Sequence, residues 1–114
     1  MGTKLPLLKG TLDLLILKAL SCAPAHGYGL ATWLERHSDG DLIADDSALY
    51  QALHRMEGRG LVQAEWGVTE NSRRARYYRL TPRGEEHLES EARTWRRYAA
   101  SVSAILSVDP STAG

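Results

Sequence analysis

Apolar residues in the first half of the chain recur with helical spacing in three segments. Residues 7–21 are apolar on almost every side, which indicates a helix that is covered on more than one face. Residues 26–37 carry one apolar stripe, and residues 47–58 repeat apolar side chains at steps of three and four. Pro24, a turn at 38–40 and the glycines Gly58 and Gly60 separate or end these segments. The pattern predicts three helices joined by short turns.

The second half of the chain predicts a hairpin and one further helix. LVQAEW (61–66) and ARYYRLT (75–81) are short strand candidates joined by GVTENSRR. Thr81 and Pro82 are typical of a helix start, with proline at the first helical position. The fold class expected is therefore mainly α with a β-hairpin wing. Residues 1–81 would form a winged helix–turn–helix domain, residues 82–107 a C-terminal dimerisation helix, and residues 108–114 a disordered tail.

The predicted last helix carries apolar residues at alternating steps of four and three along one face. This spacing is typical of a helix that packs against a partner helix. In so short a chain, a second subunit is also a plausible cover for the apolar first helix. We therefore expect a homodimer. The expected interface residues are Leu8, Leu12, Leu88, Ala92, Trp95, Ala99, Val102 and Leu106.

Length, charge and cysteine content limit the classes of protein to which the chain can belong. The 114 residues suit one domain, and 14 basic against 14 acidic residues exclude a uniformly basic nucleic-acid binder while allowing a dipolar one. The single cysteine, Cys22, excludes an intramolecular disulfide, fits a reducing compartment and is expected to be a small buried side chain. The apolar run 12–20 is too short to span a membrane. These features predict a soluble cytoplasmic protein.

A dense basic cluster lies in the predicted hairpin. Arg73, Arg74, Arg76 and Arg79 fall within seven positions, with tyrosines between them and no acid among them. Exposed arginines at a hairpin tip can bind phosphate or enter a minor groove. Arg76 and Arg79, on the strand, either share this role or pair with acids. Of the adjacent tyrosines 77 and 78, which point to opposite faces, one is expected in the core and the other against the phosphate backbone.

The third predicted helix, which precedes this cluster, leaves a polar face. Arginine and glutamine can read guanine and adenine in the major groove, and serine, tyrosine and histidine can reach bases or phosphate. A helix of this kind followed by a basic hairpin favours binding to double-stranded DNA over an ordinary solvated surface. The expected DNA-binding residues are Ser47, Ala48, Tyr50, Gln51, His54, Arg55, Arg73, Arg74, Arg76 and Tyr78.

Other chemistries find little support in the sequence. The four histidines lie on different predicted elements, and none forms a ligand-like spacing with Cys22, so no metal or other cofactor is expected. Phosphate-loop and nucleophile motifs are absent, so the chain is not expected to be an enzyme. The alternative to a DNA-binding regulator is a winged-helix module that dimerises and binds protein.

The sequence allows two roles for Trp95. On the apolar face of the last helix it is first a dimer-packing residue, but two copies facing each other would also form a flat slot for a small planar aromatic effector. Of the other two tryptophans, Trp33 is expected in the core and Trp66 at the base of the hairpin, which it would shield.

Four stretches together resemble the PadR family of transcriptional regulators: LKGTLDLLILKAL, HGYGLATWLE, SALYQALHRMEGRGLVQAEWG and ENSRRARYYRLTPRGEEHL. The resemblance covers residues 8–106, and the single last helix is similar to the compact PadR subgroup. It implies a homodimeric winged helix–turn–helix repressor whose third helix enters the major groove while the wing follows the backbone.

The resemblance also implies roles for single residues. Tyr50 matches the family's recognition-helix tyrosine, the arginines 73, 74 and 76 its basic wing, and Tyr78 its YYxLT strand. Trp95 occupies a place comparable to a pocket-lining tryptophan of drug-responsive relatives. Many members have GTLYPAL where this chain has SALYQAL, so its helix contacts are expected to differ: Ala48 lacks a hydroxyl, and Gln51 would add a DNA contact.

Overall fold

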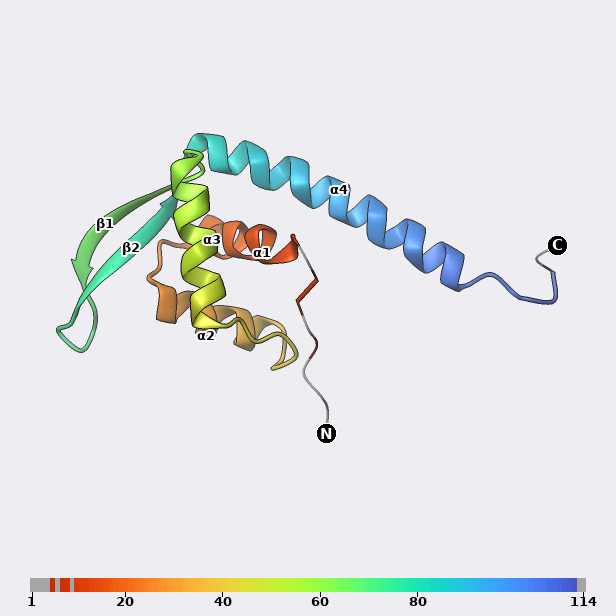
Figure 1. Ribbon diagram of the computed structural model, residues 1–114, viewed down its shortest axis with the longest axis horizontal. Helices are drawn as coiled ribbons and strands as arrows, with labels where there is room; N and C mark the ends of the chain where they lie inside the picture. The colour runs from red at the N-terminus through yellow and green to blue at the C-terminus, as the bar shows by residue number, and fades with distance from the viewer. Residues whose placement is uncertain (1–4, 6, 9, 113–114) are drawn as a thin grey trace.

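The computed structural model describes residues 5, 7–8 and 10–112, and it confirms the expected fold class of helices with a β-hairpin wing (Figure 1). The third helix begins one residue earlier than predicted, and the first begins several residues later. In chain order the elements are α1 (Thr11–Cys22), α2 (Gly27–His37), α3 (Asp46–Gly58), β1 (Val62–Val68), β2 (Arg74–Leu80) and α4 (Pro82–Leu106).

Among the helices of the described residues, α2, α3 and α4 each begin at a residue whose side chain satisfies a free backbone N–H group. His26 Nδ1 accepts the N–H of Gly29 at the start of α2, and the Asp45 carboxylate accepts the N–H of Ala48 at the start of α3. Thr81 caps α4 in the same way, with proline at the first helical position as predicted. These local signals set where α2, α3 and α4 begin.

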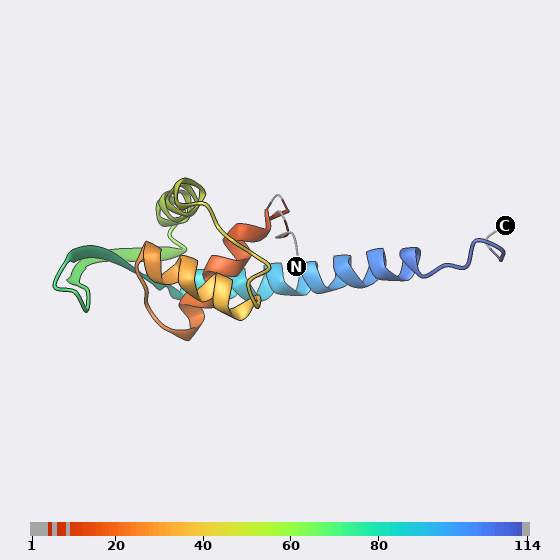
Figure 2. The same cartoon turned by 90° about the horizontal axis from the view of Figure 1, so that it is seen from below.

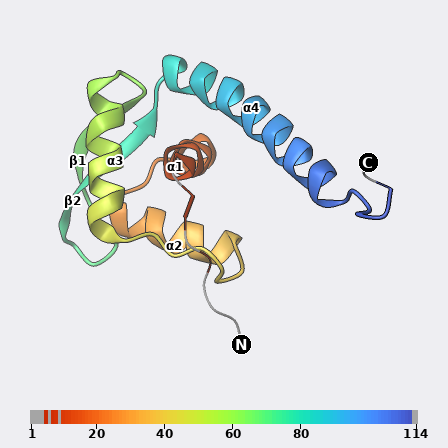
Figure 3. The same ribbon diagram turned by 45° about the vertical axis from the view of Figure 1, so that its right-hand side comes forward.

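Helix α1 lies at the centre of the molecule. Figure 3 shows it nearly end-on, with α2, α3 and α4 arranged around it. Its Ile16 and Leu17 are fully buried and pack with Leu30 of α2 and with Leu49 and Leu53 of α3. The all-round apolar character of α1 is therefore explained largely by the chain's own helices, including α4, and less by a second subunit than the sequence suggests.

The hairpin is antiparallel, with Val62 opposite Leu80 at its base and Val68 opposite Arg74 near its tip. A third segment joins its base, because Ala25 and Tyr78 exchange backbone hydrogen bonds of 2.8 and 3.1 Å. Val62 is buried, whereas Val68 is 68% exposed. The hairpin therefore begins on the core and extends away from it, as Figures 1 and 2 show. We call residues 62–80 the wing.

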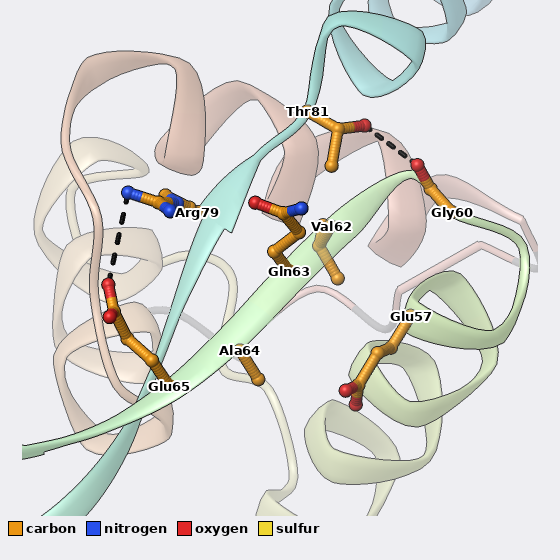
Figure 4. Close-up of a pocket in the computed structure, with 8 residues that line it drawn as sticks. All are labelled: Glu57, Gly60, Val62, Gln63, Ala64, Glu65, Arg79 and Thr81. Carbon is orange, nitrogen blue, oxygen red and sulfur yellow. Dashed lines mark hydrogen bonds and ion pairs between the residues drawn. The ribbon is translucent and has the colours of Figure 1, made fainter.

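The junction between the wing and α4 is held by Thr81. Its N–H donates to the carbonyl of Leu61, and its hydroxyl donates to the carbonyl of Gly60 at 2.7 Å (Figure 4). Gly84, in the first turn of α4, is buried directly against the Leu61 carbonyl, where a Cβ atom would collide with that oxygen. The direction in which α4 leaves the body is therefore set by close backbone packing.

From this junction α4 extends past the body of the protein (Figures 1 and 2). Gly84 is its only buried residue among those described, and its outer turns carry exposed apolar side chains. Residues 108–112 contain a turn closed by Asp109, while residues 113–114 of the predicted tail lie outside the described residues. None of the described helices combines the length and the apolar character that crossing a membrane requires.

Cys22 and Trp66 do not lie where the sequence predicts. Cys22 is exposed, because it is the last residue of α1 and lies beyond the turn that faces the core. Trp66 is 59% exposed and does not shield the base of the wing, because β1 has already left the core at this position. Trp33, by contrast, is partly buried and packs against the core as predicted.

Candidate nucleic-acid interface

Helix α3 separates into a buried and an open face. Leu49, Ala52, Leu53 and Met56 are buried, and the remaining polar positions point away from the core. Ser47, Tyr50, Gln51, His54 and Arg55 are exposed, and Ala48 is half-buried at the cap. The Gln51 side-chain amide makes a long hydrogen bond of 3.4 Å to Ser47 Oγ, one turn away. The face expected to read bases is thus open to solvent.

One member of that face is already engaged. The Arg55 guanidinium donates to the Asp13 carboxylate of α1 at 2.6 Å, and about half of the arginine side chain remains exposed. Arg55 therefore serves as a link between α3 and α1. To reach a guanine it would have to release this carboxylate.

Tyr50 projects from α3 over the first turn of α2. An ideal Cβ atom built on Gly27 would lie 2.5 Å from the Tyr50 hydroxyl oxygen and 2.7 Å from its Cζ atom. Only a glycine allows this approach without displacing the ring. Tyr50 remains 52% exposed, so the contact orients the side chain without burying it.

The arginines of the wing divide into paired and open groups. Arg76 donates to Glu57 at the end of α3 at 2.8 Å, and Arg79 lies 3.8 Å from Glu65 on the neighbouring strand. The sequence allows Arg76 and Arg79 either to bind DNA or to pair with acids, and in the structure both pair with acids. Within residues 5, 7–8 and 10–112, no acid forms an ion pair with Arg73 or Arg74. The open positive charge of the wing therefore lies at its tip.

Two hydrogen bonds between Thr69 and Arg73 close the tip of the wing. The Thr69 N–H donates to the Arg73 carbonyl at 2.7 Å, and the Arg73 N–H donates to the Thr69 hydroxyl at 3.2 Å. Ser72, with φ of 61°, occupies the left-handed region that lets the chain turn back. The two arginines thus project from a closed turn and not from a loose loop.

Tyr78 lies in the core and not on the DNA-facing surface. Its side chain is 5% exposed, and this burial raises the pKa of its hydroxyl above the ordinary value of 10.0. This finding corrects the expectation that Tyr78 contacts DNA. Its neighbour Tyr77 is half-buried, with its ring edge-to-face against His26 at 5.1 Å and lying over Gly67.

A cleft of about 670 Å³ joins the wing to the start of α2 and α3. Its lining brings Tyr50 beside the open arginines of the tip, and it adds two residues that the sequence reasoning missed, His26 and Tyr28. Tyr28 is 77% exposed. The signal for both was the HGYG stretch, which places two aromatic polar side chains at a helix start. The lining residues are His26, Tyr28, Tyr50, Thr69, Glu70, Asn71, Arg73, Arg74, Ala75 and Arg76.

A second surface is apolar and lies along α4. Leu12 and Leu88, expected at a dimer interface, are partly buried and pack against the core, and Ala92 and Ala99 are half-buried. The exposed residues include Tyr98 and Ile105, which the sequence reasoning missed because it followed a strict seven-residue repeat. We call the exposed set the α4 apolar face: Leu8, Trp95, Tyr98, Val102, Ile105 and Leu106.

Trp95 also borders an apolar pocket of about 550 Å³ between α4 and the N-terminal segment, lined mainly by leucines that include Leu8, Leu14 and Leu42. No histidine is among the residues that line this pocket. Across the part of the chain that the structure describes, no three His, Cys, Asp or Glu side chains gather closely enough to hold a metal ion.

The arrangement defines a winged helix–turn–helix protein: α3 packs against α2 with its polar face open, and a hairpin with a basic tip follows it. The family model of the PadR-like transcriptional regulators matches residues 16–90. The chain therefore belongs to the PadR-like family, and with it to the proteins that regulate transcription by binding DNA.

Solved structures show the same fold. A PadR family regulator from Eggerthella lenta is 30% identical, with a TM-score of 0.76, over 89% of this chain and 86% of that one. A PadR-like regulator from Bacillus cereus is 27% identical, also with a TM-score of 0.76, over 90% and 97% of the two chains.

One relative is similar in sequence. A 37.1 kDa transposon protein of Streptomyces fradiae is 37% identical over 79% of this chain. The matched segment makes up only 24% of that protein.

Proposed function

We propose that the chain is a sequence-specific, homodimeric repressor of transcription. The observation that carries this proposal is the cleft that places Tyr50 of α3 beside Arg73 and Arg74 of the wing. A helix face able to read bases and a pair of arginines able to bind phosphate thus border the same opening. Arg73 and Arg74 can direct their charge to DNA because, among the described residues, no acid forms an ion pair with them.

In this proposal α3 enters the major groove and the wing follows the backbone. Ser47, Gln51 and His54 lie on the open face of α3, where Gln51 can bond an adenine edge in the two-point manner typical of its amide. Arg73 and Arg74 contact phosphates or the minor groove beside the helix. The phosphate contacts supply affinity and position, and the α3 contacts supply the sequence preference.

A second copy covers the α4 apolar face. This face exposes Trp95, Tyr98, Val102, Ile105 and Leu106 along one helix, a larger apolar stripe than a solvated helix needs. A twofold axis here would present two α3 helices to half-sites about one helical turn apart, roughly 34–36 Å. Repression would follow from occupying a promoter with this dimer.

An effector of small, planar, aromatic chemistry would bind beside Trp95. The pocket there is lined mostly by leucines, which suits an apolar ligand, and the indole ring offers a stacking surface. A ligand in this pocket, next to the part of α4 that the second copy covers, would change the angle between the two DNA-binding halves. Such a change would release the DNA.

The test is fluorescence anisotropy of the protein with DNA from the region upstream of its own gene, at two salt concentrations and with random competitor DNA. We expect binding that survives competitor and weakens as salt rises. Arg74→Ala should weaken binding to all sequences and lower the salt slope, whereas Gln51→Ala should change the preferred sequence. Arg97→Ala, an exposed arginine on α4, is the matched control for lost charge and should leave binding unchanged.

Two results would contradict the proposal. Equal affinity for the upstream DNA and for random DNA would contradict sequence-specific binding. It would favour the alternative of a winged-helix module that binds protein. An Arg74→Ala variant with unchanged affinity and salt slope would show that the wing does not contact the backbone.

A further inference from the structure

Trp66 is the most exposed tryptophan of the chain, and it lies on the wing. Its side chain is 59% exposed, and that of Val68, two residues further along β1, is 68% exposed. A large aromatic side chain contributes most to stability when it is buried, and here it gains little from the core. Packing of the core therefore does not explain why a tryptophan occupies this position.

The strand register places Trp66 on the same face as two arginines. Trp66 lies opposite Arg76, and Val68 lies opposite Arg74, so all four side chains share one face of the hairpin. Arg74 is the diagonal neighbour of Trp66, a relationship within reach of long and aromatic side chains. The guanidinium carbon of Arg74 lies 4.5 Å from the centre of the Trp66 ring, well inside the range of a cation–π contact.

The two arginines on this face are held in different ways. Arg76 is bound by the carboxylate of Glu57, which neutralises its charge locally. The guanidinium carbon of Arg74 lies over the uncharged ring of Trp66, and no acid among the described residues pairs with this arginine. A cation–π contact with a ring that offers no acceptor oxygen leaves the guanidinium N–H groups available for hydrogen bonds. Arg74 is therefore both oriented and able to bind an anion.

We propose that Trp66 is a positioning residue that holds Arg74 ready for a phosphate of the DNA backbone. This inference rests on the proposed function, in which the wing follows the DNA. A free arginine side chain loses rotational freedom when it binds, and a side chain already held in place loses less. Trp66 thus raises affinity through Arg74, without itself contacting the DNA.

The test is a double-mutant cycle in the full-length protein with the upstream DNA. Trp66→Leu should weaken binding about two- to fivefold, the range expected for an exposed cation–π contact. In the Arg74→Ala background the same change should have no further effect. Trp66→Tyr keeps an aromatic ring and should retain most of the affinity. Val68→Ala, which alters the residue directly opposite Arg74, is the matched control and should bind normally.

Two further readouts separate positioning from a general structural role. Trp66→Leu should lower affinity while the salt slope stays the same, because Arg74 still reaches its phosphate; Arg74→Ala should lower both. In the protein without DNA, the side-chain proton resonances of Arg74 should be shifted upfield by the indole ring and return to ordinary positions in Trp66→Leu. The thermal midpoints should be similar, since Trp66 is exposed.

The outcomes distinguish this inference from the proposed function. If Trp66→Leu weakens binding equally with and without Arg74, the indole contacts DNA directly and the positioning role is wrong. It is also wrong if the Arg74 resonances show no ring shift in the free protein. If the wild-type protein binds no DNA specifically, or if Arg74→Ala changes nothing, the wing assignment in the proposed function fails and the inference falls with it.

Discussion

The Arg55 guanidinium on α3 is bound to the Asp13 carboxylate on α1 at 2.6 Å, a link between residues 42 positions apart. An arginine on the open face of α3 that could read a guanine is thereby already bound to a carboxylate. The pair is partly exposed, so it contributes little to stability. Its main effect in the proposed complex would be on charge at the DNA interface.

Asp13→Asn should therefore strengthen DNA binding. The substitution frees Arg55 and removes a negative charge next to α3, so we expect affinity to rise roughly two- to tenfold and the salt slope to increase. The free energy of unfolding should fall by no more than about 1 kcal/mol. Asp109→Asn, which removes the same charge from the far end of the chain, is the control. Unchanged or weaker binding by Asp13→Asn would show that Arg55 stays away from DNA.

Gly27→Ala should disturb the DNA interface more than the fold. The added methyl group would lie 2.5 Å from the Tyr50 hydroxyl oxygen, and the half-exposed ring would have to move. We expect weaker DNA binding with a loss of less than about 1 kcal/mol in stability. In a Tyr50→Ala background the same change should be neutral or stabilising, because alanine is a better helix former than glycine. Anisotropy and chemical denaturation of the four proteins measure both effects.

Gly84→Ala should destabilise the fold itself. The new Cβ atom would collide with the Leu61 carbonyl oxygen and lie 2.9 Å from Leu80 Cδ1, and the backbone oxygen cannot move without opening the wing–α4 junction. We expect a loss of about 1–3 kcal/mol in the free energy of unfolding. Gly58→Ala, at the end of α3 with no atom within 4 Å of the added methyl, should be neutral or stabilising. Equal effects of the two changes would refute the packing argument.

Tyr78 should make stability fall at alkaline pH. Burial raises its pKa in the folded state above 10.0, so the folded protein favours the neutral phenol. Its contribution is then fully present below pH about 10 and is lost as pH rises through the folded-state pKa. Tyr78→Phe should remove this part of the alkaline decline. Urea unfolding of both proteins between pH 8 and 11 would show it, and parallel curves for the two proteins would contradict it.

Val102→Glu should weaken the proposed dimer. Val102 lies within the α4 apolar face and is 37% exposed in the single chain, so the change should leave the monomer folded. Placing a carboxylate in an apolar interface costs several kcal/mol, which is enough to shift the species from dimer to monomer at micromolar concentration. Ala100→Glu, on another side of α4, is the matched control. Sedimentation velocity would settle the point, and a Val102→Glu protein that remains dimeric would place the interface elsewhere.

The order of the elements and the open face of α3 are determined by residues that are close together in the sequence. Apolar spacing separates Leu49 and Leu53, which are buried, from Gln51 and His54, which are exposed. Thr81 marks the start of α4 because its hydroxyl caps the backbone a few residues ahead. Signals of this kind act over one or two turns, so they can be recognised without knowledge of how the helices pack.

The tertiary structure decided which of these side chains are available. Arg76 is neutralised by Glu57 across 19 positions, and Arg55 by Asp13 across a greater separation. Alternation along β2 predicts that one of its two tyrosines is buried, but the packing of β2 against α1 decides that it is Tyr78. The exposure of Cys22 and Trp66 likewise depends on where α1 and the wing leave the core. Pairing and burial of this kind depend on contacts between distant segments, which the spacing of residues within one segment cannot specify.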